Sequence, residues 1–464
     1  MNNCTIILFG ATGDLACRKI IPALYHMIHK QHITRWALVA SSIDSIDPKE
    51  LLERSKKYIP NIDQATWQAM QEHTYFVSLD VTKREDYRAL KDAVERVEQK
   101  TGLPGNRIFY LATAAYYFCD ITHSLAATEL ARRSGANDSA WHRIIYEKPF
   151  GHDLDSARMI NKCIESYFSE DQIFRIDHFL TKELVGNIGL IRFSNSVFEP
   201  LWNNKHIDNV QIILSESIGI EGRGAYYDSY GALSDVVQNH CLEMLALIAM
   251  EAPEKLVGDY IRESRAAVLS RVRFNDGILG QYNGYEHERG VKQGSRTETF
   301  AALAFKIDNE RWQGVPFYVK TGKALQGKET VIHIEFKPAR CILAKACPNE
   351  PNVLTIEIAP DAGFRLKLNA KKVGSPDEVT PVSMEFCHSC LYGPFTPEDY
   401  EVLFQEVIRG DQSVGVRFDE IEFAWNIIDQ IKKKKLPLYS YQKGSNGPEE
   451  IETFEQQHAM RWRS

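Results

Sequence analysis

The chain has 464 residues, of which 44% are hydrophobic and 25% charged, proportions that are ordinary for a soluble globular protein of two domains or one large one. The formal net charge of −7 excludes the broad basic field that binds nucleic acid, and no apolar run is long enough to span a membrane. We therefore expect neither a nucleic-acid nor a membrane partner, and any anion must be bound by a local group of cationic side chains.

The first third of the sequence alternates apolar strands with amphipathic helices. Strands are predicted at 5–9, 37–40, 75–78, 108–111, 144–146 and 173–175, with helices at 14–30, 84–100 and 121–133. This alternation is typical of a parallel, doubly wound sheet. We predict an α/β Rossmann-like dinucleotide-binding domain over residues 1–174.

After about residue 175 the pattern changes. Helices are predicted at 225–250, 254–272, 397–409 and 418–434, and short β-rich runs at 300–306, 316–320, 331–336, 353–358 and 364–368. Because no helices separate these runs, they indicate a large, mainly antiparallel sheet. We predict an α+β domain over residues 175–464.

The first predicted strand ends in a loop rich in small residues. Gly10, Gly13 and Ala16 would let the backbone turn tightly and approach a pyrophosphate at the start of the following helix. Arg18 and Lys19 follow within the next turn and could meet a phosphate. The loop lacks the full Gly-x-Gly-x-x-Gly pattern, so a simple tight turn is the alternative, but its place after an N-terminal strand favours nucleotide binding.

The end of the second predicted strand bears on the choice of cofactor. An acid at this position binds the ribose 2′-hydroxyl of NAD, whereas an arginine accommodates the 2′-phosphate of NADP. The sequence reads Ser41-Ser42-Ile43-Asp44, with an acid and no arginine. It favours NAD, although the two serines could still serve a phosphate.

Lys148, in Glu147-Lys148-Pro149-Phe150-Gly151, comes at the carboxyl edge of the predicted sheet, where ligands of this architecture bind. Its ammonium could donate to a substrate oxygen. A loop with a solvated lysine is the alternative interpretation.

The segment 175–183 combines an acid, an imidazole and an ammonium. His178 and Lys182 are four residues apart, so on a predicted helix they would share a face and present two cationic donors to an anion. Asp177 would point elsewhere and could orient another base. The alternative is a solvated helix start with Asp177 as its cap.

His240 lies within an apolar stripe, where a histidine is usually a core residue. A catalytic role becomes the better interpretation if Asp177 reaches it, because a carboxylate fixes the imidazole tautomer and stabilises the imidazolium. Lys323 and Lys328, after an apolar strand, are further candidates for holding an anion.

Nine dispersed cysteines predict reduced thiols in a cytoplasm rather than a disulfide framework. Cys387 and Cys390 have the spacing of a zinc knuckle, but no second such pair accompanies them. Cys341 and Cys347 could complete a site only by folding nearby. We predict no metal.

Seven segments in order give the chain a resemblance to the glucose-6-phosphate dehydrogenase family along nearly its whole length. They are GATGDLACRK, IIYEKPFGHDL, RIDHFLTKELVGNI, FEPLWNNKHIDNVQI, EGRGAYYDSYGALSDVVQNH, FYVKTGKAL and YEVLFQEVIRGDQ. The resemblance implies oxidation of glucose 6-phosphate at C1 to 6-phosphogluconolactone with hydride transfer to NAD or NADP, the first step of the oxidative pentose phosphate pathway. It also implies a homodimer or homotetramer, with residues 175–464 providing substrate binding and oligomerisation.

The resemblance also implies roles for individual residues. His240 resembles the general base and Asp177 the residue that orients it. The substrate phosphate would be held by His178, Lys182 and Lys328, and the sugar by Lys148, Glu216, Asp235 and Lys323. The cofactor would be held by Gly10, Thr12, Gly13, Asp14, Lys19, Asp44 and Lys148.

Three positions depart from the family pattern. Ile43, followed by Asp44, stands where arginine is common, so we predict that NAD is used at least as well as NADP. Phe179 replaces the usual tyrosine and Thr181 the usual glycine, changes that leave open a related hexose 6-phosphate as substrate. A non-catalytic nucleotide-binding relative is the remaining alternative, against which Asp177 and His240 both argue.

Overall fold

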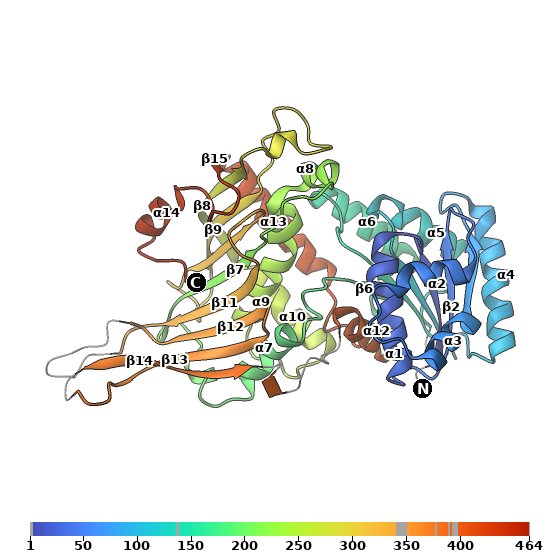
Figure 1. Ribbon diagram of the computed structural model, residues 1–464, viewed down its shortest axis with the longest axis horizontal. Helices are drawn as coiled ribbons and strands as arrows, with labels where there is room; N and C mark the ends of the chain where they lie inside the picture. The colour runs from blue at the N-terminus through green and yellow to red at the C-terminus, as the bar shows by residue number, and fades with distance from the viewer. Residues whose placement is uncertain are drawn as a thin grey trace. The chain divides into compact units, whose positions relative to one another are not determined.

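A computed structural model describes residues 3–135, 139–339, 350–375, 378–387, 390–391 and 398–463. The chain divides into two units, each formed by several segments (Figure 1). The first unit comprises residues 1–181, 257–262 and 397–418, and the second comprises residues 182–256, 263–396 and 419–464. Within the described ranges, every helix is too short or too polar to cross a lipid bilayer.

The first unit contains a six-stranded parallel sheet with the strand order β3-β2-β1-β4-β5-β6. Its strands are β1 (Asn3–Phe9), β2 (Arg35–Ser42), β3 (Thr74–Ser78), β4 (Arg107–Leu111), β5 (His142–Tyr146) and β6 (Ile173–Arg175). This is the doubly wound order of dinucleotide-binding domains, and it confirms the predicted fold class. The central strands β1 and β4 are buried along nearly their whole length, because helices cover both faces of the sheet.

Alternate residues of β1 face different helices. Ile6 and Leu8 share one hydrophobic cluster with α1, α2, α3 and α12, whereas the Phe9 ring lies 6.2 Å from the Tyr87 ring of α4. Tyr110 of β4 packs against Phe404, which brings the late helix α12 into this unit. The helices are α1 (Ile21–His29), α2 (Pro48–Lys56), α3 (Gln64–His73), α4 (Arg84–Thr101), α5 (Phe118–Ala127), α6 (Leu154–Tyr167) and α12 (Asp399–Arg409).

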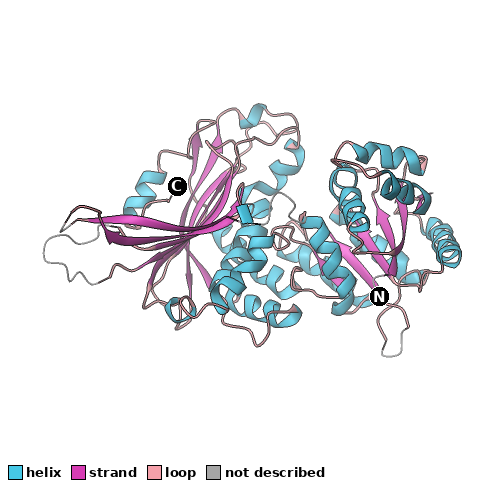
Figure 2. Ribbon diagram, turned by 60° about the horizontal axis from the view of Figure 1, so that its bottom comes forward, coloured by secondary structure: helices cyan, strands magenta, loops and turns pink. Residues whose placement is uncertain are grey.

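The second unit contains a nine-stranded sheet with the order β14-β13-β12-β11-β7-β10-β9-β8-β15 (Figure 2). Its strands are β7 (Ile207–Ser215), β8 (Val272–Tyr282), β9 (Phe300–Ile307), β10 (Phe317–Gly322), β11 (Glu329–Phe336), β12 (Val353–Ala359), β13 (Gly363–Lys371), β14 (Val379–Cys387) and β15 (Leu438–Tyr441). Only the pairs β7–β10 and β8–β15 are parallel among these neighbours, so the predicted mainly antiparallel sheet is confirmed.

Helices α9 and α13 lie along one face of this sheet, and α14 lies on the other (Figure 1). The helices of the second unit are α7 (Glu183–Phe193), α8 (Gly224–Ala232), the π-helix η5 (Leu233–Cys241), α9 (Leu242–Ala249), α13 (Phe418–Lys433) and α14 (Ile451–Gln457). Helix α10 (Gly258–Leu269) begins in the first unit and continues in the second. Single 3-10 turns lie at Ala115–Tyr117, Glu170–Gln172, Glu199–Leu201 and Tyr285–His287.

The helix predicted over 225–250 is not one regular α-helix. Gly231, with φ 67° and ψ 178°, separates the body of α8 from η5, and α9 begins only at Leu242. η5 and β10 are in contact, which anchors this segment to the large sheet.

Candidate active site

The loop after β1 turns into the short helix η1 (Ala16–Ile20) in the way that the sequence predicts. Gly10 has φ +71°, and a Cβ at this position would overlap the carbonyl oxygen of Ala112. The Gly13 N–H donates to the Gly10 carbonyl at 3.0 Å and closes the turn. Thr12 is half-buried, whereas Gly13 and Asp14 are exposed, so this backbone is accessible and fits a dinucleotide cofactor.

Asp44 lies directly beyond β2 and contacts the same loop. Its Oδ2 accepts hydrogen bonds from Thr12 Oγ1 at 2.8 Å and from Ser42 Oγ at 3.2 Å. The Asp44 N–H donates to Ser42 Oγ at 3.0 Å, which fixes the turn out of the strand. An acid held beside the glycine loop has the placement that suits a cofactor ribose.

Lys19 and Arg18 are exposed side chains on η1, and both face carboxylates. Lys19 Nζ lies 3.4 Å from Glu398 Oε2, and Arg18 Nη1 lies 3.3 Å from Asp14 Oδ2. Ion pairs this exposed are worth little, so a phosphate could replace either carboxylate at small cost.

Lys148 follows β5 at the carboxyl edge of the parallel sheet and is half-buried. The residue before it, Glu147, is buried and accepts hydrogen bonds from the Tyr110 hydroxyl and, at 3.4 Å, from the Tyr400 hydroxyl. Burial raises the pKa of the Glu147 carboxyl, an effect that the two tyrosine hydroxyls and the neighbouring Lys148 oppose.

The prediction that His178 and Lys182 share a helix face is wrong. Residues 178–181 form a turn, and α7 begins only at Glu183, with Lys182 as its N-cap. The Phe179 N–H donates to Asp177 Oδ1 at 2.9 Å, and Thr181 Oγ1 donates to the His178 carbonyl at 2.8 Å. These short-range bonds from Asp and Thr side chains satisfy the backbone in a turn and compete with helix formation.

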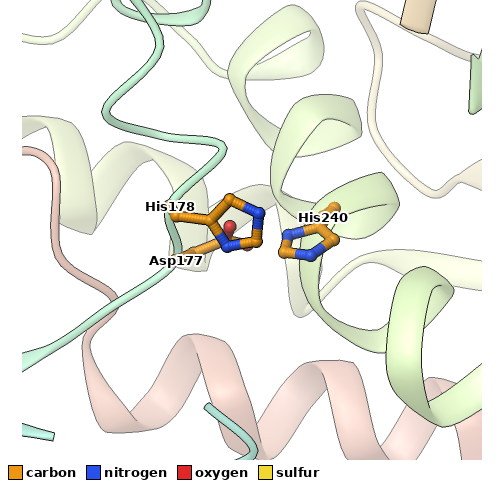
Figure 3. Close-up of side chains that lie close together, drawn as sticks. All are labelled: Asp177, His178 and His240. Atoms are coloured by element: carbon orange, nitrogen blue, oxygen red, sulfur yellow. The ribbon is translucent and has the colours of Figure 1, made fainter. Parts of the chain in front are cut away.

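Asp235 and His240 are both carried by the π-helix η5, and both are buried. In an α-helix, with 3.6 residues per turn, five residues cover about 1.4 turns, so two such side chains would point to nearly opposite sides. A π-helix joins residues five apart by hydrogen bonds, so it turns these two side chains toward the same side. Figure 3 shows His240 on this helix and Asp177 and His178 on the turn that follows β6.

Glu216, Lys323 and Asp235 converge within the second unit. Glu216 follows β7 and Lys323 follows β10, which are adjacent parallel strands, and their side chains form an ion pair. The Lys323 ammonium lies 5.7 Å from the centre of the Tyr227 ring. The Tyr226 hydroxyl donates to Asp235 Oδ1 at 3.3 Å. We define Glu216, Lys323, Asp235 and Tyr227 as the polar cluster.

Tyr227 remains a neutral phenol in this setting. Burial raises its pKa well above the ordinary value, and the carboxylates of Asp235, Glu298 and Glu216 raise it further. Its hydroxyl has no hydrogen-bond partner among the residues that the structure describes. Lys328 is exposed and lies outside the polar cluster, directly before β11.

The prediction that the cysteines are reduced thiols is wrong for four of them. Cys119 of α5 and Cys163 of α6 form one disulfide, and Cys387 and Cys390 form another. Cys387 and Cys390 therefore do not stand as the zinc knuckle that their spacing resembles. Cys341 and Cys347 lie outside the described residues.

Tyr226, Tyr227 and Glu298 are contacts that the sequence alone did not single out. The two tyrosines lie in the same quoted segment as Asp235, eight and nine residues before it, and that proximity was the available signal. Glu298 accepts a hydrogen bond from the Leu233 N–H at the start of η5, 65 positions earlier in the sequence. Neither periodicity nor spacing indicates such a contact.

A parallel sheet in the doubly wound order, a glycine loop and an acid after the second strand define the class of nicotinamide-dinucleotide oxidoreductases. The family model described as Glucose-6-phosphate dehydrogenase, NAD binding domain, matches residues 7–187, and the one described as Glucose-6-phosphate dehydrogenase, C-terminal domain, matches residues 189–463. The chain therefore belongs to the glucose-6-phosphate dehydrogenase family, which confirms the resemblance noted in the sequence.

Individual relatives agree with this assignment. The glucose-6-phosphate 1-dehydrogenase of Bacillus subtilis (strain 168) is 38% identical over 481 residues, covering 98% of this chain and 97% of the relative. A solved structure of glucose-6-phosphate dehydrogenase in complex with its substrate glucose-6-phosphate has a TM-score of 0.91 at 32% identity, covering 100% of this chain and 99% of that one. The Mycobacterium avium glucose-6-phosphate 1-dehydrogenase structure has a TM-score of 0.85 at 33% identity, with the same coverage of both chains.

Proposed function

We propose that this protein oxidises glucose 6-phosphate at C1 to 6-phosphogluconolactone, with hydride transfer to a nicotinamide cofactor. The observation that carries the proposal is the polar cluster of the second unit, in a chain that belongs to the glucose-6-phosphate dehydrogenase family. Its two carboxylates and its ammonium supply the acceptors and donors that sugar hydroxyls require.

We assign His240 as the general base and Asp177 as the residue that orients it, the roles that membership of the glucose-6-phosphate dehydrogenase family suggests. As the C1–H bond breaks, a nitrogen of His240 takes the proton of the C1 hydroxyl, and the C1–O bond becomes a double bond. When bound, the nicotinamide accepts the departing hydride. A general base contributes roughly 10²–10⁴-fold to such a step.

The environment of Asp177 supports its assigned role. The side chain is buried, and the Phe179 N–H fixes one of its carboxylate oxygens. A buried carboxylate is costly unless a cation lies near it. The imidazolium that His240 becomes on taking a proton would be such a cation, so Asp177 favours the protonated product of the base step.

We propose that His178, Lys182 and Lys328 bind the phosphate of the substrate. His178 and Lys182 come from the turn after β6 and the N-cap of α7, and Lys328 is exposed directly before β11. Binding a phosphate that does not react places C1 through interactions remote from the chemistry. Lys148, Glu216, Asp235 and Lys323 then contact the sugar hydroxyls and the C1 oxygen.

We propose that NAD is used at least as well as NADP. The cofactor residues are those of the loop after β1 and of the end of β2, with Lys148 after β5: Gly10, Thr12, Gly13, Asp14, Lys19, Asp44 and Lys148. The Asp44 carboxylate, held by Thr12 and Ser42, can accept hydrogen bonds from ribose hydroxyls. The same negative charge would repel a 2′-phosphate, which supports the preference.

We further propose that residues 1–174 are the dinucleotide-binding domain and residues 175–464 the substrate-binding and oligomerisation domain of a cytoplasmic homodimer or homotetramer. β14 at the edge of the large sheet exposes Val382 and Met384, and exposed apolar side chains on one strand support an interface there.

A related hexose 6-phosphate is the second candidate substrate. Its support is the turn that carries His178, where Thr181 donates to the His178 carbonyl and Phe179 stands without a hydroxyl. Either change could alter how the turn meets its ligand.

Initial rates with glucose 6-phosphate and a panel of 6-phosphosugars, each with NAD and with NADP, test these proposals together. We expect glucose 6-phosphate to have the highest kcat/KM. A large preference for another sugar would favour the second candidate, and no NADH or NADPH formation with any of them would indicate a non-catalytic relative.

A further inference from the structure

We propose that Glu298 is a positioning residue for this reaction. Its carboxylate holds the first turn of η5 and thereby sets the directions of Asp235 and His240 on that helix. The inference rests on the proposed function, which assigns the base to His240 and a sugar contact to Asp235.

Glu298 caps a helix that is remote from it in sequence. Glu298 Oε1 accepts a hydrogen bond from the Leu233 N–H at 3.0 Å, and the Glu298 carbonyl accepts one from the Ala232 N–H at 2.9 Å. The first N–H groups of a helix have no partner inside it, so an outside acceptor decides where the helix begins. Here that acceptor comes from the segment that leads into β9.

Gly231 and Glu298 fit each other. Gly231 has φ +67°, and a Cβ built on it would overlap the Glu298 carboxylate. The carboxylate therefore occupies the space that the glycine leaves open, directly where the α-helical part of α8 ends. This contact places the break between α8 and η5 at Gly231.

The charge of Glu298 suits this place. The partial positive charge of a helix N-terminus favours a carboxylate. Burial raises the pKa of Glu298, while its hydrogen bonds and the Lys432 ammonium oppose that rise. Lys432 of α13 also donates to Ser234 Oγ at 3.2 Å, so two side chains from different parts of the second unit hold the start of η5.

The register of η5 matters because Asp235 and His240 are five residues apart. They point toward the same side only while the hydrogen bonds of this stretch join residues five apart. If the first turn relaxed to α-helical geometry, the angle between the two side chains would change by roughly a quarter of a turn. A His240 side chain displaced in this way would still be buried in the core, but its ring nitrogen would no longer reach the C1 hydroxyl.

The test compares Glu298→Ala with Glu298→Gln in the full-length protein. The glutamine amide oxygen can still accept from Leu233, so Glu298→Gln should keep kcat within about threefold of the wild type, whereas Glu298→Ala should lower kcat by about 10²-fold, the cost of a small misplacement. The KM for NAD should stay unchanged in both variants, because the cofactor loop lies in the other unit.

Asp63→Ala is the matched control. Asp63 caps α3 by accepting from the Thr66 N–H at 2.7 Å, and α3 carries none of the assigned site residues. The Asp63→Ala variant should lose about as much thermal stability as Glu298→Ala, but it should keep the wild-type kcat. Should Glu298→Ala fail to fold, Glu298→Asp takes its place, because it keeps the charge but shortens the reach by one methylene, and it should lower kcat with an intact fold.

The proposal would be wrong if Glu298→Ala lost as much stability as Asp63→Ala but kept the wild-type kcat. It would also be wrong if Glu298→Gln folded normally but was as slow as Glu298→Ala. Failure of the proposed function is recognised separately, since the wild type itself would then form no NADH or NADPH with glucose 6-phosphate, and failure of the base assignment would leave His240→Asn active.

Discussion

The Thr12 hydroxyl donates a hydrogen bond to Asp44 Oδ2 at 2.8 Å, which ties the loop after β1 to the end of β2. This hydrogen bond and the one from Ser42 Oγ hold the Asp44 carboxylate beside the glycine loop, where we propose that it binds the cofactor ribose. This arrangement makes cofactor choice the most accessible property to test.

Asp44→Ala should lower kcat/KM for NAD by about 10–10²-fold, the cost of hydrogen bonds to a charged group. The kcat/KM for NADP should fall less or rise, because the repulsion of a 2′-phosphate is removed. Asp47→Ala is the control, since Asp47 is also exposed and only caps α2 through the Lys49 N–H. An equal loss with both cofactors would show that Asp44 does not meet the ribose.

Lys182→Ala should raise the KM for glucose 6-phosphate by about 10–10²-fold, since a charged hydrogen bond is worth roughly 1.5–3 kcal/mol. The kcat/KM for unphosphorylated glucose should stay at its wild-type value, because that substrate has no phosphate for Lys182 to bind. Lys205→Ala, an exposed lysine before β7, serves as the control. The assignment of Lys182 to the phosphate would be wrong if Lys182→Ala lowered kcat/KM for glucose 6-phosphate and for glucose by the same factor.

Tyr227 should affect Lys323 through its ring rather than its hydroxyl. Tyr227→Phe keeps the ring beneath the ammonium and should leave the KM for glucose 6-phosphate near the wild-type value. Tyr227→Leu removes the cation–π contact, worth roughly 0.5–2 kcal/mol, and should raise that KM by about 2–30-fold. Tyr285→Leu removes the buried ring that packs on Tyr227, and it should lower stability with a smaller change in KM. Equal KM values for Tyr227→Phe and Tyr227→Leu would contradict the ring's role.

His142 should make the fold less stable in mild acid. The Arg132 N–H donates to His142 Nδ1 at 2.9 Å, and burial, with a smaller contribution from Arg107, lowers its pKa from 6.5 to about 4. Between these two values the unfolded chain binds a proton that the folded chain does not, so stability falls as pH falls from about 6.5 to about 4, by up to roughly 1.4 kcal/mol per pH unit.

Urea unfolding of wild type and His142→Gln between pH 7 and about pH 4 measures this effect. The variant should lose less stability over that window, although His333, whose pKa burial also lowers to about 4, remains to contribute. His287→Gln removes an exposed histidine and should leave the slope unchanged. Identical slopes for wild type and His142→Gln would show that His142 takes up its proton in the folded state.

The parallel sheet of the first unit could be predicted because its strands are short apolar runs between amphipathic helices. A short apolar run followed by an amphipathic helix, such as 5–9, is best explained as a strand that is buried on both faces of a parallel sheet. β7 was not predicted, since Ile207–Ser215 mixes Asp208, Asn209 and Gln211 with apolar residues. β14 was missed because most of its side chains are exposed.

The local geometry of the candidate site was harder to predict than its residues. At 177–181 the backbone can be satisfied either by helical hydrogen bonds or by bonds to the Asp177 and Thr181 side chains. The i, i+4 spacing of His178 and Lys182 does not show which of the two forms. The π-helical form of 233–241 depends on Gly231 and on Glu298, a contact across 65 positions. Helical periodicity predicted a helix there, but it carries no information on the register that a distant carboxylate imposes.

The pH dependence of kcat/KM for glucose 6-phosphate tests His240 most directly, measured in wild type, His240→Asn and Asp177→Asn. The wild-type value should rise with pH as one base loses its proton and then level off. His240→Asn should be slower by about 10²–10⁴-fold and should lose that rise, with Asp177→Asn slower than the wild type. A His240→Asn protein with the wild-type rate and the wild-type profile would contradict the assignment of this histidine as the base.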